Sequence, residues 1–247
     1  ERAPLKQAVI LIAGGGTRLG SRTMSRPKCM LEVQGKSLLA RMLTYLHQAG
    51  IKETILVVGY QADFVRKHIG QQWNSMEIQY IFNDDWATTN NVVSLAMATA
   101  SLKQDFILLE GDLIFMWEAF KNMLGPNRIA VDRFQPYMDG TVVSIDEKGF
   151  TDRFYLKSTS GRPSNLTSYY KTVNIYSFDF KNYTSAIVPR LQHLIESGQD
   201  QAYYEQAIAD AIDDQDLKLE CVLFSGTSWY EIDTEEDFNQ AEDLFTS

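Results

Sequence analysis

The chain alternates short apolar runs with longer segments in which apolar residues recur every three or four positions. The runs at 8–13, 54–59, 77–82 and 105–110 predict strands. The segments from 37 to 46, 62 to 69 and 91 to 102 place their apolar residues on one helical face and predict helices. Strands and helices in alternation predict a parallel sheet covered by helices on both faces, with ligands bound beyond the carboxyl ends of the strands.

The pattern changes beyond Gly125-Pro126. Segments 141–146, 150–157 and 171–178 predict strands joined by turns, so this half of the chain should be antiparallel or mixed. Helical patterns return at 183–196, 203–212 and 234–245, and segment 217–224 predicts a further strand. We expect one domain over residues 1–247, with a division near residue 125.

Composition excludes several classes of function. The 247 residues are 45% hydrophobic, and 23 Lys and Arg against 32 Asp and Glu leave a net charge of −9, which disfavours binding to nucleic acid or anionic lipid. The apolar runs are too short for membrane insertion and no signal peptide is recognised, so we expect a cytoplasmic protein. Cys29 and Cys221 form neither a disulfide framework nor a zinc site and are expected to be reduced. The histidines, at 47, 68 and 193, lie in helical segments away from the motifs.

A glycine-rich loop, GGGTRLGSRTMSRPKCMLEV at 14–33, follows the first strand. It lacks the lysine of a P-loop before Ser21, and Leu19 replaces the third glycine of a dinucleotide-binding motif. Its glycines allow close approach of phosphates, and positive charge comes from Arg18, Arg22, Arg26 and Lys28. A plain strand-to-helix connection usually has about two to six residues. The length of the loop therefore favours a phosphate site over a simple connection.

Two acidic residues stand at the ends of predicted strands. Asp112 follows DFILLEG, where ligands of a parallel sheet are expected, although a simple turn residue would also fit. Asp233 follows SWYEI and has Glu236 three residues later, so it could instead be the N-cap of the last helix. Spacing alone leaves both alternatives open.

The segment LIAGGGTRLGSRTMSRPKCMLEVQGKSLL resembles the signature of nucleoside-triphosphate transferases of the sugar-nucleotide pyrophosphorylase type. The matching residues are Gly15, Gly16, Arg18, Leu19, Pro27 and Lys28, and the resemblance continues through FNDDWATTNNVVSLAMA, LLEGDLIF and SWYEIDTEEDF. It implies a Rossmann-like (GT-A-like) α/β fold with a mixed, mostly parallel sheet and a smaller antiparallel portion. Residues 1–125 would then bind the nucleotide and residues 126–247 the second substrate.

The resemblance also implies the reaction. An ionised phosphate or phosphonate oxygen would attack the α-phosphorus of the nucleotide and expel pyrophosphate, with no general base. Arg18 and Lys28 would contact the phosphates, and Mg²⁺ would be held between Asp112 and Asp233. The expected nucleotide-binding residues are Ala13, Gly14, Gly15, Gly16, Thr17, Arg18, Lys28, Asn83, Asn90, Asn91, Ser94, Glu110 and Gly111.

The segment around Asn90 and Asn91 resembles the cytidylyltransferase branch and implies CTP, although turn and helix-cap roles for the pair would fit the sequence as well. MDGTVVSID and YYKTVNIYSF resemble enzymes that cytidylylate 2-aminoethylphosphonate. In that interpretation Asp139 would bind the amine, and Arg133 or Lys171 the phosphonate. The expected substrate-binding residues are Arg133, Tyr137, Asp139, Lys171, Asn174, Trp229, Tyr230 and Glu231.

Other interpretations remain. Phosphocholine is the second acceptor, because aromatic residues at 86, 117, 137, 169, 170, 229 and 230 could form a cage for a trimethylammonium group. Segment 137–141, however, lacks the tryptophan of the phosphocholine enzymes. Further alternatives for the acceptor are phosphoglutamine and a sugar 1-phosphate. The chain could also be a non-catalytic, nucleotide-binding regulatory domain. A homodimer or a fusion to a further catalytic domain is compatible with the sequence.

Overall fold

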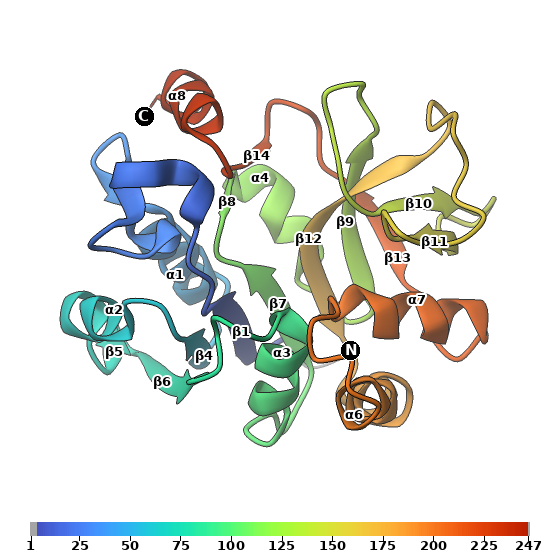
Figure 1. Ribbon diagram of the computed structural model, residues 1–247, viewed down its shortest axis with the longest axis horizontal. Helices are drawn as coiled ribbons and strands as arrows, with labels where there is room; N and C mark the ends of the chain where they lie inside the picture. Colours follow the sequence, from blue (N-terminus) through green and yellow to red (C-terminus); the bar gives the residue numbers. More distant parts are fainter. Residues whose placement is uncertain (1–3, 247) are drawn as a thin grey trace.

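The computed structural model describes residues 4–246, and one continuous mixed sheet runs through both halves of them (Figure 1). Its central strands are parallel and lie in the spatial order β7 (Phe106–Glu110), β1 (Gln7–Ile12), β4 (Glu53–Val58) and β6 (Met76–Phe82). The chain builds outward from β1 on one side and then returns to its other side as β7. Such a reversal of strand order is where α/β sheets bind ligands.

The second half of the chain extends the same sheet. Strand β12 (Tyr170–Phe178) pairs antiparallel with β7, so the two halves share backbone hydrogen bonds. Beyond it lie β9 (Arg128–Arg133), β10 (Val142–Ile145), β11 (Thr151–Tyr155) and β13 (Glu220–Leu223). The expected mixed sheet with a smaller antiparallel portion is confirmed by these pairings.

Two layers of helices cover the sheet, because side chains along its strands point alternately to its two faces. In β1, Ile10 and Ile12 join one apolar cluster, whereas Val9 and Leu11 join the other. The first cluster includes residues of α1 (Leu38–Gln48) and α2 (Ala62–Ile69). The second includes residues of α3 (Asn91–Thr99), α6 (Val188–Glu196) and α7 (Glu205–Asp213).

Shorter elements complete the described chain. They are β2 (Glu32–Val33), β3 (Lys36–Ser37), β5 (Gln72–Trp73), β8 (Leu113–Phe115), α4 (Trp117–Phe120), α5 (Phe180–Asn182), β14 (Trp229–Glu231), α8 (Glu235–Leu244), 3-10 turns at Thr17–Thr23, Lys28–Met30 and Lys121–Met123, and a π-helical turn at Tyr183–Ile187. In Figure 1, α8 lies beside the N-terminal loop, although the two are at opposite ends of the chain. Among the described residues no helix is long and apolar enough to cross a membrane.

Several elements differ from the sequence-based expectations. Strands β8, β9 and β14 were not predicted, because each has too few consecutive apolar residues to stand out, and β9 ends on the buried Asp132 and the exposed Arg133. The helix expected at 183–196 begins as a π turn. The last helix begins at Glu235, with Thr234 as its N-cap. Cys29 is buried and Cys221 half-buried, and both are free thiols.

Candidate active site

The glycine-rich loop leaves β1 and folds back on itself. Gly16 has φ 60°, and a Cβ there would lie 3.2 Å from Cβ of Lys28, so glycine allows the two ends of the loop to approach closely. The Thr23 hydroxyl donates to the carbonyl of Gly16 at 2.9 Å and holds this fold. Arg22 donates from two nitrogens to the carboxylate of Glu235 on α8, at 2.6 and 2.7 Å. The loop is therefore docked against the C-terminal helix.

Asp112 and Asp233 lie side by side because of the small antiparallel pair β8 and β14. Asp112 immediately precedes β8, and Asp233 follows β14 by two residues. The amide of Ile232 donates to the carbonyl of Asp112 at 2.8 Å and fixes their register. The alternative role of Asp233, as the N-cap of the last helix, is wrong. The N-cap is Thr234, one residue later, and it forms the capping box with Asp237. The Asp233 side chain is thereby left for the site.

Lys28 contacts both aspartates. Its Nζ lies 2.7 Å from Asp233 Oδ1 and 3.7 Å from Asp112 Oδ2, and Arg18 approaches Asp233 at 3.5 Å from an exposed position. Burial opposes the charge of Lys28, but Asp112 and Asp233 raise its pKa overall. Burial also acts against the Asp233 carboxylate, yet Lys28 holds the pKa of Asp233 below its ordinary value. Lys28 is therefore a cation held at the centre of an acidic site.

A third carboxylate completes a cluster suited to a metal ion. Oxygens of Asp112, Glu231 and Asp233 all lie within 4.8 Å of one another. Asp112 Oδ1 is buried and has no hydrogen-bond partner among residues 4–246, and burial raises the pKa of this carboxyl group. Burial also raises the pKa of Glu231, to about 8. Mg²⁺ prefers such oxygen ligands, so the donor set fits this ion.

A first cavity of about 230 Å³ opens beside the loop, at the carboxyl ends of β1 and β7. Trp86, which the sequence suggested only for an aromatic cage, lines it and packs over Gly15, where a Cβ would lie 3.3 Å from the indole. Gly15 itself and the exposed Thr17 and Arg18 are absent from this lining, and Arg18 lines the second cavity instead. Ten of the expected nucleotide-binding residues are present: Ala13, Gly14, Gly16, Lys28, Asn83, Asn90, Asn91, Ser94, Glu110 and Gly111.

The asparagines of this cavity also stabilise the local fold. Asn83 is buried and donates to the hydroxyl of Ser94 at 3.1 Å. Asn90 caps α3, and the side-chain oxygen of Asn91 accepts a hydrogen bond from the amide of Tyr204 at 2.8 Å. The helix-cap alternative for Asn90 is therefore confirmed, and the same residue still forms part of the cavity wall.

A second cavity of about 550 Å³ lies next to the first. Glu110, Asp112 and Tyr203 line both cavities, so the two meet at the predicted metal site. Expected site residues in the second lining are Arg18, Tyr137, Asp139, Lys171, Asn174, Trp229, Tyr230, Glu231 and Asp233. Sequence reasoning missed others, including Met138, Thr141, Leu156, Lys157 and Glu205.

The structure separates Arg133 from this cavity. Arg133 ends β9, is exposed, and its guanidinium lies 5.9 Å from the ring centroid of Tyr170, outside both linings. Arg133 is the last residue of β9, where it pairs with Tyr170 of β12, and it is the exposed end of a strand whose residues 129–132 are all buried. Trp117, Tyr169 and Tyr170 are likewise absent from the two linings, so these members of the suggested aromatic cage do not converge there.

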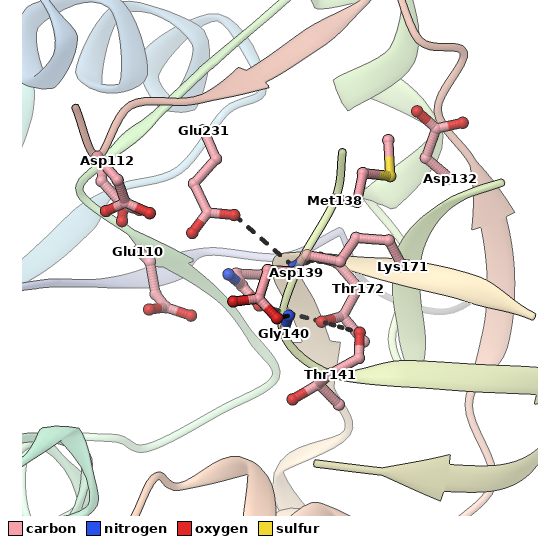
Figure 2. A network of polar contacts seen from close by, with 12 residues as sticks. Glu110, Asp112, Asp132, Met138, Asp139, Gly140, Thr141, Lys171, Thr172 and Glu231 are labelled. Carbon is pink, nitrogen blue, oxygen red and sulfur yellow. Dashed lines mark hydrogen bonds and ion pairs between the residues drawn. The ribbon is translucent and has the colours of Figure 1, made fainter. Parts of the chain in front are cut away.

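Lys171 is the buried cation of the second cavity. Figure 2 shows its side chain directed toward Glu231, beside the segment of Asp139 and Gly140. Its Nζ donates to the carbonyl of Thr172 at 2.7 Å and lies 3.7 Å from Glu231 Oε2. Gly140 has φ 101°, and a Cβ there would be 3.3 Å from Lys171 Nζ. Glycine at 140 therefore leaves space for the ammonium group.

Comparison with known proteins places the chain in a family. Residues 8–147 match the MobA-like NTP transferase domain. The chain is 32% identical, over 97% of its length, to CMP-5'-(3-aminopropyl)phosphonate synthase of Streptomyces rubellomurinus, but it spans only 39% of that protein. It is 27% identical to choline-phosphate cytidylyltransferase of Streptococcus pneumoniae, over 96% of this chain and 97% of the relative.

Solved structures share the fold. CTP:phosphocholine cytidylyltransferase of Streptococcus pneumoniae matches 99% of this chain and 100% of its own, with a TM-score of 0.82 at 22% identity. The inositol-1-phosphate CTP transferase from T. maritima matches 99% of this chain and 96% of its own, with a TM-score of 0.77 at 21% identity. The match to the family model covers more than half of the chain, and a relative above 30% identity aligns along nearly all of it. The chain belongs to the MobA-like NTP transferase family.

Proposed function

We propose that this chain is a magnesium-dependent cytidylyltransferase that transfers CMP from CTP to a small aminoalkyl phosphonate, with 2-aminoethylphosphonate as the acceptor. The observation that carries the proposal is the meeting of two cavities at Asp112, with Lys28 and Asp233 beside it. One cavity would hold the nucleotide and the other the acceptor. The activities named for the two relatives, a CMP-phosphonate synthase and a choline-phosphate cytidylyltransferase, support CTP and a phosphonate or phosphate acceptor.

The reaction joins two anions. A phosphonate oxygen attacks the α-phosphorus of CTP, a new P–O bond forms, and the bond to the bridging oxygen breaks, so its electron pair leaves with pyrophosphate. Because the attacking oxygen is already ionised, no side chain has to remove a proton. Lys28 and Arg18 lower the repulsion between the reactants, and the backbone of the glycine-rich loop binds the leaving group.

The three carboxylates of the acidic cluster, Asp112, Glu231 and Asp233, would hold Mg²⁺. When bound, Mg²⁺ supplies positive charge for the phosphates. Lys28 already occupies one side of this cluster, at 2.7 Å from Asp233. We expect Lys28 to exchange part of this contact for a phosphate oxygen when CTP enters.

The first cavity suits a pyrimidine nucleotide. The amides of Asn83, Asn90 and Asn91 line it and supply donors and acceptors for the edge of a base, while Trp86 supplies an aromatic wall. The buried Lys171 in the second cavity supplies a cation for the phosphonate.

Phosphocholine is the second candidate acceptor. Tyr137, Trp229 and Tyr230 all line the second cavity and offer aromatic surface to a trimethylammonium group. Trp229, however, already donates from Nε1 to Asp132 at 2.7 Å and is buried, so its ring is fixed in the cavity wall.

The test is release of pyrophosphate from CTP and Mg²⁺ with a panel of acceptors: 2-aminoethylphosphonate, phosphocholine, phosphoethanolamine, phosphoglutamine and a hexose 1-phosphate. We expect turnover to be highest with 2-aminoethylphosphonate, to be lost on chelation of the metal, and to fall about 100-fold or more in Asp112→Asn. Asp63→Asn, at a side chain that is 99% exposed on α2, is the matched control. Absence of pyrophosphate release across the panel would favour a non-catalytic role, and preference for a hexose 1-phosphate with UTP or dTTP would reject the phosphonate assignment.

A further inference from the structure

Glu205 is a buried carboxylate that faces the second cavity. It is the first residue of α7, only 7% of its surface is exposed, and it lines the cavity. The hydroxyls of Thr141, Tyr176 and Thr172 hydrogen-bond to its carboxyl group, and that of Tyr176 donates to Oε2 at 3.3 Å. The positive charge that acts on Glu205 is that of Lys171. Lys171, however, forms an ion pair with Glu231, at 3.7 Å. Glu205 therefore has no ion pair among residues 4–246.

The carboxylates close to the metal cluster already have partners. Asp233 is paired with Lys28 at 2.7 Å, and Asp112 lies 3.7 Å from the same nitrogen. Glu110 accepts a hydrogen bond from the hydroxyl of Tyr204 at 2.8 Å, and burial, reinforced by Asp112, raises its pKa well above the ordinary value. These groups already have partners or lie at the reacting centre.

The carboxylates at the rim of the cavity are also committed. Asp139, which the sequence suggested for the amine, is two-thirds exposed and paired with Lys157 at 2.5 Å. Asp237 accepts from the amide of Thr234 at 2.9 Å in the capping box of α8. Of the carboxylates in the described lining, Glu205 and Glu110 have neither a cation nor a capping role, and Glu110 lies where the two cavities meet, beside the acidic cluster. Glu205 is thus the one of the two that lies in the second cavity alone.

A buried carboxylate without an ion pair, such as Glu205 in the second cavity, favours a ligand that carries a positive charge. The ammonium of Lys171, the buried cation of this cavity, pairs with Glu231 and donates to the carbonyl of Thr172, and its charge acts on Glu205 without an ion pair. A buried carboxylate without a cation is costly, and an ammonium group offers three hydrogen-bond donors. Burial raises the pKa of the Glu205 carboxyl group, and the positive charge of Lys171 opposes this shift.

We propose that Glu205 selects acceptors that carry an ammonium group, by pairing with that group at the inner end of the second cavity. Tyr176 is a positioning residue, because its hydroxyl holds the carboxylate toward the cavity. This inference rests on the proposed function, since it assigns the amine of the same acceptor. It replaces Asp139, whose partner is Lys157, as the amine-binding carboxylate.

The experiment compares 2-aminoethylphosphonate with propylphosphonate, in which a methyl group replaces the ammonium at nearly equal size. Calorimetric titration measures both dissociation constants for the wild type and for Glu205→Gln. We expect the wild type to bind the amine about 30-fold or more tightly, because a buried charge pair is lost with propylphosphonate. Glu205→Gln should bring the two dissociation constants within about threefold of each other, mainly by weakening the binding of 2-aminoethylphosphonate.

Asp139→Asn is the matched control and should keep the wild-type preference. Thermal unfolding checks that each variant is folded. Should Glu205→Gln fail to fold, Glu205→Asp serves in its place, since it keeps the charge but withdraws the carboxylate by one methylene, and it should lower the preference by about threefold or more. An undiminished preference in the folded variant, or a wild type that binds both phosphonates equally, overturns the proposal.

Pyrophosphate release separates this inference from the proposed function. If the wild type binds the amine selectively but releases no pyrophosphate from CTP, the amine site stands and the cytidylyltransferase assignment fails. If both phosphonates are cytidylylated with equal kcat/KM, the assignment of activity stands and the role of Glu205 fails.

Discussion

Removal of the Lys28 ammonium should destabilise the metal-free protein. With an effective dielectric constant of about 20, a charge pair at the 2.7 Å that separates Lys28 from Asp233 gains roughly 6 kcal/mol, and the 3.7 Å pair with Asp112 roughly 4.5 kcal/mol. Desolvation of the three groups offsets much of this gain. Breaking a buried pair nevertheless costs about 3 to 5 kcal/mol, and we take the lower value because the groups are about one-fifth exposed.

For Lys28→Met we therefore expect the free energy of unfolding to fall by about 3 kcal/mol, which in a chain of this size lowers Tm by about 6 to 12 °C. Differential scanning calorimetry with EDTA measures the change. Lys121→Met removes an exposed lysine paired with Glu118 and should shift Tm by about 1 °C or less.

Addition of Mg²⁺ tests the same reasoning from the opposite side. Lys28 and a divalent cation would compete for Asp233, so Mg²⁺ should raise Tm more in Lys28→Met than in the wild type. Turnover of CTP should still fall about 100-fold or more, because the variant lacks the cation at the phosphates. An unchanged Tm in EDTA, or an equal response to Mg²⁺ in both proteins, would refute the view that Lys28 neutralises this cluster.

Two further predictions concern packing and thiol chemistry. Gly111→Ala should lower the free energy of unfolding by about 2 kcal/mol or more, because a Cβ there would lie 2.2 Å from Cγ2 of Ile12 and force the strands apart. Urea titration measures this change, and a variant as stable as the wild type would contradict the argument. Burial raises the pKa of the Cys29 thiol to about 12, so at pH 8 the group is almost entirely protonated. Iodoacetamide should therefore alkylate Cys29 slowly in the native protein and rapidly in urea, as followed by mass spectrometry, and fast native alkylation would disprove the burial argument.

The sequence predicted the local elements of the first half well, because each has a strong apolar period of its own. Strand β1 and helix α1 lie within about two residues of their expected bounds. Strand β9 was missed because Ile129–Val131 is its only apolar run and the buried Asp132 appears polar. Burial of Asp132 depends on the indole of Trp229, 97 residues later in the chain, which no local pattern contains.

Some residues of the candidate site were identified from the sequence, and others only from the tertiary structure. Resemblance singled out Arg18, Lys28, Asp112 and Asp233, and the structure brings the four together. It could not exclude Arg133, since this residue is exposed because it ends β9, and that strand was not predicted. Nor could it find Glu205, whose position in a helix is typical of a solvent-exposed glutamate until α7 packs against the sheet.

The amino-acid sequence by itself therefore determined the type and order of the main elements of the first half and singled out the glycine-rich loop as a candidate phosphate site, since periodicity and glycine conformations act over a few residues. Only the tertiary structure decided which charges meet. The pairing of β8 with β14 placed Asp233 beside Asp112, and the docking of α7 turned Glu205 into the second cavity. Both results depend on contacts between distant segments, since β14 lies more than 110 residues after β8 and α7 packs against β11, about 50 residues earlier. Their free energy comes from burial that no local segment achieves alone.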